Sequence, residues 1–193
     1  VHRLQQPKTC GKCHKKSLVG PFLESVHGKR LFEGKRKDAK KGEPTEGPTC
    51  SSCHGAHKVL LADVLRNAAY KKRVTKACAK CHEKEAKVYE ASVHGVALLN
   101  RSNGSAAASC VDCHLSHTIR KAKDPKSNVY KTKVVEVCSR CHADQRLVRR
   151  FGLDPNVVKT YEESFHGRAR HLGAAKVADC ASCHNYHAIF RAD

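Results

Sequence analysis

The pentapeptide Cys10-Gly11-Lys12-Cys13-His14 is the first copy of the motif that decides how this chain of 193 residues folds. The same Cys-x-x-Cys-His motif recurs five more times, and together the copies use all twelve cysteines. The other copies are Cys50-Ser51-Ser52-Cys53-His54, Cys78-Ala79-Lys80-Cys81-His82, Cys110-Val111-Asp112-Cys113-His114, Cys138-Ser139-Arg140-Cys141-His142 and Cys180-Ala181-Ser182-Cys183-His184. Because no cysteine is left over, one chemical purpose accounts for all of them.

Cys-x-x-Cys-His is the attachment site of c-type haem. Two thiols add across the two vinyl groups of the porphyrin, and the histidine that follows ligates the iron from one face. The short spacing places all three groups on one helical turn, beneath one edge of the haem. The sequence therefore predicts six covalently bound haem c groups, in which every cysteine is a thioether.

Other uses of cysteine fit this pattern less well. A zinc ribbon uses Cys-x-x-Cys pairs but has no need of a histidine directly after each pair. A disulfide framework needs cysteines whose bridges close long loops. A thioredoxin-type site has one Cys-x-x-Cys rather than six. Zinc binding remains as the minor alternative.

The composition offers little material for a protein core. Aromatic residues make up 5% of the chain, and Trp and Met are absent. Porphyrin faces are large and apolar, so their burial supplies the missing core. We expect a mostly irregular chain with short α-helices around a row of six haems, and a haem-free chain that is largely unfolded.

The chain is strongly basic, with 37 Lys and Arg against 18 Asp and Glu, for a formal net charge of +19. Two propionates and one iron–porphyrin centre per haem reduce this to about +13 when oxidised and about +7 when reduced. The remaining charge favours acidic redox partners or anionic surfaces. We do not expect nucleic acid as a partner.

Two features bear on the location of the protein. No run of apolar residues approaches the roughly 20 needed to span a bilayer. C-type haem is attached outside the cytoplasm, and the chain starts at Val1 rather than Met. We therefore expect a periplasmic or extracellular protein whose signal peptide has been removed.

The motifs form a threefold repeat. They begin at residues 10, 50, 78, 110, 138 and 180, and the gaps alternate between long and short. This spacing predicts three two-haem units, about 1–70, 71–130 and 131–193, within a single hexahaem domain, 1–193. After the first motif of each unit comes aromatic-x-x-Ser-[Val/Phe]-His-Gly, and the second motif extends to Cys-x-x-Cys-His-x-x-His. The aromatic-x-x-Ser copies begin at Phe22, Tyr89 and Tyr161.

Local patterns predict some of the secondary structure. We expect short helices at Glu83 to Ser92 and at Pro155 to Ser164, with the glycine after each Ser-x-His as a helix C-cap. Residues 34–48 and 100–109 have the composition of loops.

Of the fourteen histidines, twelve recur at equivalent places, and twelve is the number of iron ligands that six haems need. The histidine of each Cys-x-x-Cys-His is the expected ligand on one face: His14, His54, His82, His114, His142 and His184. One Ser-x-His and one His-x-x-His histidine per unit are the expected ligands on the other: His27, His57, His94, His117, His166 and His187. With no Met in the chain, bis-histidine haems of low potential are expected.

Two histidines fall outside the repeat. His171 is an alternative ligand to His166, and His2 is expected to be a tail residue. The alternative for His2 is a ligand role towards a haem in a neighbouring subunit.

Histidines three residues apart lie on nearly one face of a helix. A His-x-x-His histidine such as His57 cannot reach the far side of its own haem, so it should ligate a neighbouring one. Within the first unit this places His57 on the haem of Cys10 and Cys13, and His27 on the haem of Cys50 and Cys53. The other two units are expected to repeat this assignment.

The pattern Cys-x-x-Cys-His … Ser-Val-His-Gly … Cys-x-x-Cys-His-x-x-His resembles the doubled Cys-x-x-Cys-His cytochromes. These include the periplasmic decahaem conduits of outer-membrane electron export and the pentahaem donor to nitrite reductase. The ligand pattern is also similar to that of the multihaem cytochromes that polymerise into extracellular filaments. The resemblance runs from Cys10 to His187, although the haem number differs. It implies a lightly helical chain around haems in alternating parallel and perpendicular contact.

Six-coordinate haems leave no position for a substrate, so we expect an electron-transfer protein and not an enzyme. Its partners would be redox proteins or an extracellular acceptor. It would act as a discrete carrier or as a subunit of a conducting homopolymer with haem–haem contacts between subunits. The alternative is a multihaem reductase of nitrite, hydroxylamine or a similar small substrate, which requires one open iron position.

Overall fold

The computed structural model describes residues 2–14, 16–33, 46–55, 67–100 and 104–191. The chain forms two compact units, Val1–Lys121 and Ala122–Asp193. The first unit contains four of the Cys-x-x-Cys-His motifs and the second contains two. The prediction of one domain with three repeats stays a prediction.

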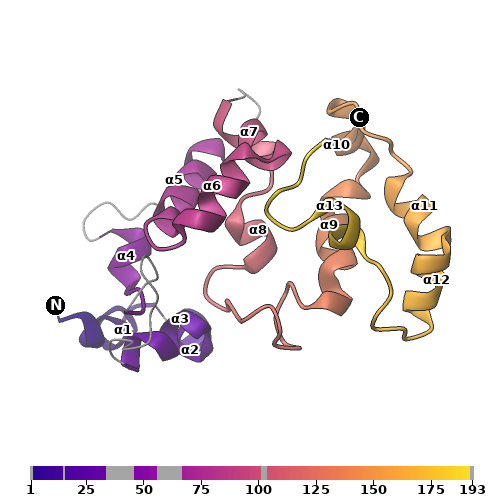
Figure 1. Cartoon of the computed structure of the whole chain (residues 1–193). Coiled ribbons are helices and arrows are strands. Elements are labelled where there is room, and N and C mark those ends of the chain that lie inside the picture. The colour runs from indigo at the N-terminus through magenta and orange to yellow at the C-terminus, as the bar shows by residue number, and fades with distance from the viewer. Residues whose placement is uncertain (1, 15, 34–45, 56–66, 101–103, 192–193) are drawn as a thin grey trace. The chain divides into compact units, whose positions relative to one another are not determined.

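Short helices make up the regular structure, and the described residues contain no strand (Figure 1). The first unit has η1 (Arg3–Gln5), α1 (Gln6–Cys10), α2 (Lys16–Glu24), α3 (Val26–Phe32), α4 (Cys50–His54), α5 (Ala68–Ala79), α6 (Glu83–Ala91), α7 (Val93–Asn100), η3 (Gly104–Ala106) and α8 (Cys110–His114). The second has η4 (Lys131–Lys133), α9 (Val134–His142), α10 (Gln145–Arg150), α11 (Val157–Glu163), α12 (Phe165–His171) and α13 (Cys180–His184). The expected class, irregular with short α-helices, is confirmed.

The local predictions were partly right. Helices α6 and α11 confirm those expected at Glu83 to Ser92 and Pro155 to Ser164. Most of the loop predicted at residues 34–48 lies outside the described residues. The described part of 100–109 contains the end of α7 and the short η3, followed by irregular chain.

The Ser-x-His-Gly motif starts a helix, so the prediction that its glycine caps a helix end was wrong. Ser25 is the N-cap of α3: its hydroxyl accepts a hydrogen bond from the Gly28 amide at 3.1 Å and donates to the Phe22 carbonyl at 2.6 Å. Ser92 and Ser164 make the same two bonds before α7 and α12. A serine that satisfies a free amide at a helix N-terminus stabilises that helix.

The glycine of this motif lets two helices approach closely. Each one lies in the first turn of the second helix of a pair, α2–α3, α6–α7 or α11–α12. A Cβ atom at Gly28, Gly95 or Gly167 would overlap with the backbone carbonyl oxygen of the aromatic residue six positions earlier. Glycine is therefore required here by the close backbone contact rather than by a positive φ.

The protein core is thin. Apart from Pro7, the described residues bury eight hydrophobic side chains: Leu31, Ala86, Leu98, Ala107, Val134, Val135, Val148 and Ala181. Large apolar side chains remain exposed, among them Leu172 at 90% and Phe165 at 79%. Most of the buried polar side chains are helix caps, such as Ser25, Ser92 and Ser109. Polypeptide packing alone thus leaves much apolar surface uncovered, as the composition predicts.

None of the helices in the described part of the chain is long and apolar enough to cross a membrane.

The close helix contact at the Ser-x-His-Gly glycine predicts the effect of one added methyl group. Replacing Gly95 by Ala should destabilise the protein by about 1–3 kcal/mol, because the new Cβ overlaps with rigid backbone. Chemical denaturation followed by circular dichroism measures this. Gly20→Ala is the matched control, since a Cβ there meets no atom within 4 Å. Equal stability of the two variants would contradict the explanation.

Candidate haem-attachment sites

Each Cys-x-x-Cys-His motif folds as one helical turn. The second motif of each of the three repeats forms a helix of its own, α4, α8 or α13. The first motifs lie at or near the end of helices that begin before them, α1, α5 and α9. The His14 and His82 amides donate to the carbonyls of Cys10 and Cys78 at 2.8 and 2.9 Å. The first motif of the third repeat, Cys138–His142, forms the last turn of α9. Two thiols and one imidazole therefore come from one turn in all six motifs, as covalent haem attachment requires.

The helices of the second motifs begin with a capping box. Thr49, Ser109 and Asp179 directly precede the first cysteine, and each exchanges hydrogen bonds with the residue three positions later. Such reciprocal bonds satisfy the free amides of a very short helix. We did not predict these caps, although the signal is visible in the sequence as a Thr, Ser or Asp before the cysteine and a Ser or Asp three residues on.

The same helices end at the histidine. The next residue, Gly55, Leu115 or Asn185, has a φ of 74°, 64° or 64°. Our premise that His-x-x-His lies on one helical face was therefore wrong, because the chain leaves the helix between the two histidines. His117 and His187 lie in irregular chain, and His57 falls outside the described residues.

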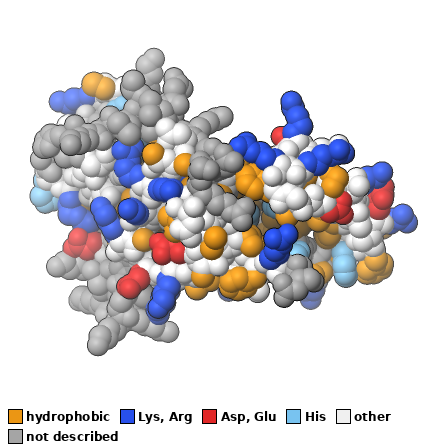
Figure 2. Space-filling view, turned by 90° about the horizontal axis from the view of Figure 1, so that it is seen from above, with side chains coloured by type: hydrophobic (Ala, Val, Ile, Leu, Met, Phe, Trp, Pro, Cys, Tyr) orange, Lys and Arg blue, Asp and Glu red, His pale blue; other side chains and the backbone are white. Residues whose placement is uncertain are grey.

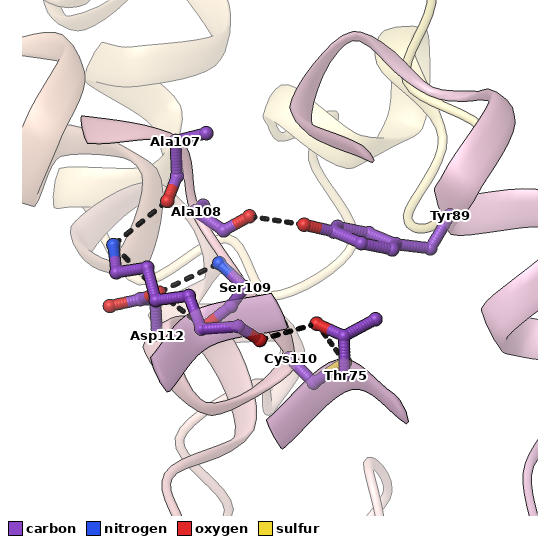
Figure 3. Close-up of polar contacts among 8 residues, drawn as sticks. Thr75, Tyr89, Ala107, Ala108, Ser109, Cys110 and Asp112 are labelled. Carbon is purple, nitrogen blue, oxygen red and sulfur yellow. Dashed lines mark hydrogen bonds and ion pairs between the residues drawn. The ribbon is translucent and has the colours of Figure 1, made fainter. Parts of the chain in front are cut away.

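A hydrogen-bond network fixes the start of α8 (Figure 3). The Tyr89 hydroxyl donates to the Ala108 carbonyl at 2.7 Å, and Lys71 donates to the Ala107 carbonyl at 2.8 Å. Lys71 also pairs with Asp112 at 3.2 Å. Burial raises the pKa of Asp112, but hydrogen bonds from Ser109 and the Lys71 ammonium outweigh it and hold that pKa below its usual value. Helices α5 and α6 thus hold the attachment turn.

The third repeat uses the same tyrosine bond. The Tyr161 hydroxyl donates to the Ala178 carbonyl at 3.0 Å, two residues before Cys180, just as Ala108 precedes Cys110. The first repeat has Phe22 at this position and no hydroxyl to donate. Instead, Arg3 donates to the Gly47 carbonyl at 2.7 Å and pairs with Glu46 at 3.2 Å. The recurring aromatic residue therefore anchors an attachment turn in two of the three repeats.

In each of the three repeats, the first cysteines of the two motifs lie in contact. The Cys50 thiol interacts with Cys10, Cys78 with Cys110, and Cys180 with Cys138. Burial and the nearby Cys10 raise the pKa of Cys50 to about 11, while the hydrogen bond from Cys138 lowers the pKa of Cys180 to about 7. The two motifs of each repeat thus lie next to each other at their first cysteines, while the division into two-haem units stays a prediction.

Two pairs of imidazole rings lie close together in the compact unit Val1–Lys121. The ring centroids of His27 and His82 are 6.1 Å apart, with planes inclined by 40°. Those of His54 and His117 are 5.9 Å apart, with planes inclined by 14°. These pairs differ from our prediction that each outer histidine ligates a haem of its own repeat. That prediction placed His27 on the haem of Cys50, Cys53 and His54.

Three further expected ligands occupy equivalent places in the chain. His94 and His166 follow their N-cap serines in α7 and α12, and His187 follows α13. His171 bonds Glu162 at 2.6 Å, and its alternative role as a ligand in place of His166 stays a prediction. His2 precedes η1 and is exposed.

The electrostatics favour neutral imidazoles. Burial lowers the pKa of His27, His54, His117 and His142, and a neighbouring histidine lowers each further. Only the neutral ring has the lone pair that binds a metal ion. His117 also lines a cavity of about 490 Å³, whose walls combine apolar side chains such as Leu18 and Leu115 with the charged Lys71 and Asp112. Thiols and neutral imidazoles together fit haem c.

A zinc centre needs four ligands from one cluster. In the ranges that the structure describes, no group of three or more Cys, His, Asp or Glu side chains is arranged to hold a metal ion. The zinc alternative therefore finds no site among the described residues.

Comparisons with known proteins agree with this chemistry. Residues 43–87 and 103–147 each match the model of the doubled CXXCH motif family. The chain is 24% identical to the multiheme cytochrome MtrA of Shewanella baltica over 188 aligned residues. The alignment covers 93% of this chain. The chain spans 45% of the length of that relative.

The hydroxyl of Tyr89 can be removed without changing the shape of the ring. Tyr89→Phe should lower the free energy of unfolding by about 1 kcal/mol, because the Ala108 carbonyl loses its donor. Chemical denaturation of the haem-bound protein measures the difference. Tyr186→Phe is the control, since that side chain is 66% exposed. A loss no greater than in the control would show that the bond does not hold the α8 turn.

Proposed function

We propose that this chain, which is a multihaem c-type cytochrome, carries six haems and relays electrons along them. The observation that carries the proposal is that all twelve cysteines lie in six Cys-x-x-Cys-His turns. The protein provides spacing and burial, while the haems provide the one-electron chemistry.

Saturated iron coordination is the reason for proposing a relay rather than an enzyme. The six motif histidines and the six recurrent ones would close both faces of every iron. The proposed outer ligands are His27, His57, His94, His117, His166 and His187. Without a vacant position, iron cannot bind a substrate such as nitrite. Ligation without methionine favours low reduction potentials.

The surface supports partners of negative charge. Lys and Arg side chains are widespread on the face that Figure 2 shows, and acidic side chains are sparser. With a formal charge of +19 before haem is counted, the protein attracts acidic redox proteins or an anionic extracellular acceptor.

The proposed location is the periplasm or the extracellular space, since c-type haem is attached outside the cytoplasm. There the protein acts as a discrete carrier or as a subunit of a conducting polymer with abutting terminal haems. Negative-stain electron microscopy of the purified protein distinguishes single particles from filaments.

Spectroscopy of the purified native protein tests the relay directly. We expect a red protein whose mass includes six haems, a sharp alpha band on reduction, and only low-spin ferric signals in electron paramagnetic resonance. The reduced form should bind no carbon monoxide. A high-spin signal that shifts when nitrite or cyanide is added would favour the reductase, and a colourless zinc protein would exclude haem.

The thin core predicts the behaviour of the chain without haem. A variant with all twelve cysteines replaced by Ala should show little helical circular dichroism and no cooperative unfolding, because few apolar side chains are buried without porphyrins. The haem-bound protein is the reference. Cooperative unfolding of the haem-free variant would show that the polypeptide folds unaided.

A further inference from the structure

The two imidazole pairs of the compact unit Val1–Lys121 combine the same two kinds of histidine. Each joins one histidine of a Cys-x-x-Cys-His motif, His82 or His54, to one recurrent histidine outside it, His27 or His117. Bis-histidine ligation of an iron needs this combination, with the first histidine fixed beside the thioethers and the second arriving from elsewhere. Both pairs also join residues of different repeats.

The separations suit a shared iron atom. A bond from metal to imidazole nitrogen is about 2 Å, and a ring nitrogen lies about 1.1 Å from its ring centroid, so two rings on opposite faces of one iron have centroids roughly 6 Å apart. The measured separations are 6.1 Å for His27 and His82 and 5.9 Å for His54 and His117.

The two chain segments that carry the outer histidines are tied together. The Val26 amide, next to His27, donates to the Ile119 carbonyl at 2.9 Å. One residue further on, Arg120 pairs with Glu24 at 3.7 Å. The backbone bond fixes the register between the start of α3 and the chain after α8, so the two outer histidines are positioned together.

The two motifs that would receive these ligands are neighbours as well. Helix α4 packs against α5, and Cys53 lies near Cys81. The family match over residues 43–87 spans these same two motifs. The second motif of the first repeat and the first motif of the second repeat therefore form one local site.

We infer that the first two repeats exchange axial ligands: His27 binds the iron of the haem on Cys78 and Cys81, and His117 binds that of the haem on Cys50 and Cys53. This inference rests on the proposed haem content. It replaces the assignment within repeats. Because each repeat completes a haem of the other, the exchange locks both into the one compact unit Val1–Lys121.

Removing a ligand and a haem together tests the assignment. His27→Ala should open one haem, seen as one carbon monoxide-binding haem per molecule after reduction. In a Cys78→Ala, Cys81→Ala background, which lacks the haem proposed as its target, His27→Ala should open none. In a Cys50→Ala, Cys53→Ala background it should still open one. The reverse pattern would assign His27 to the haem of its own repeat and overturn the inference.

His117→Ala should behave in the opposite way in the same two backgrounds. His171→Ala is the control that should open no haem in either, since that side chain bonds Glu162. If a background variant does not fold, a crystal structure of the native haem protein gives the ligands directly, and any other residue on either iron contradicts the exchange. A native protein without haem, or with an open one, would instead defeat the proposed function.

Discussion

The structure depends on one covalent constraint: two thiols and one imidazole must come from a single turn of helix beneath the edge of a porphyrin. A turn of five residues is too short to be stable by itself. Capping boxes at Thr49, Ser109 and Asp179 satisfy its amides, and side chains such as Tyr89 hold it against neighbouring helices. The short helices are therefore explained as supports for attachment turns rather than as the walls of a hydrophobic core.

Repetition extends this local solution along the chain. Each repeat pairs two helices through an N-cap serine and a glycine that permits close contact, and each brings the first cysteines of its two motifs together. The histidine after the serine is carried by the rigid start of a helix. In this way a chain with few buried apolar residues can place many haems close to one another.

Close haems with both iron faces occupied are suited to passing single electrons. The proposed ligand exchange adds a mechanical role to the same histidines, because iron–imidazole bonds would join repeats in a chain that buries few apolar side chains. Coordination would thus set both the path of the electrons and the cohesion of the fold. The basic surface would then favour partners of negative charge.

The sequence by itself determined the kinship with multihaem c-type cytochromes and the irregular helical class, whereas the haem number, the attachment residues and the threefold repeat stay predictions. These depend on residue identity and short spacing, which local chemistry fixes. It did not determine where α8 ends, why Gly95 is required, or which histidines meet. The left-handed turn at Leu115, the backbone beneath Gly95, and the contact of His27 with His82 and of His54 with His117 are products of tertiary packing. Residues far apart in the chain decide them, and no local pattern records such distances.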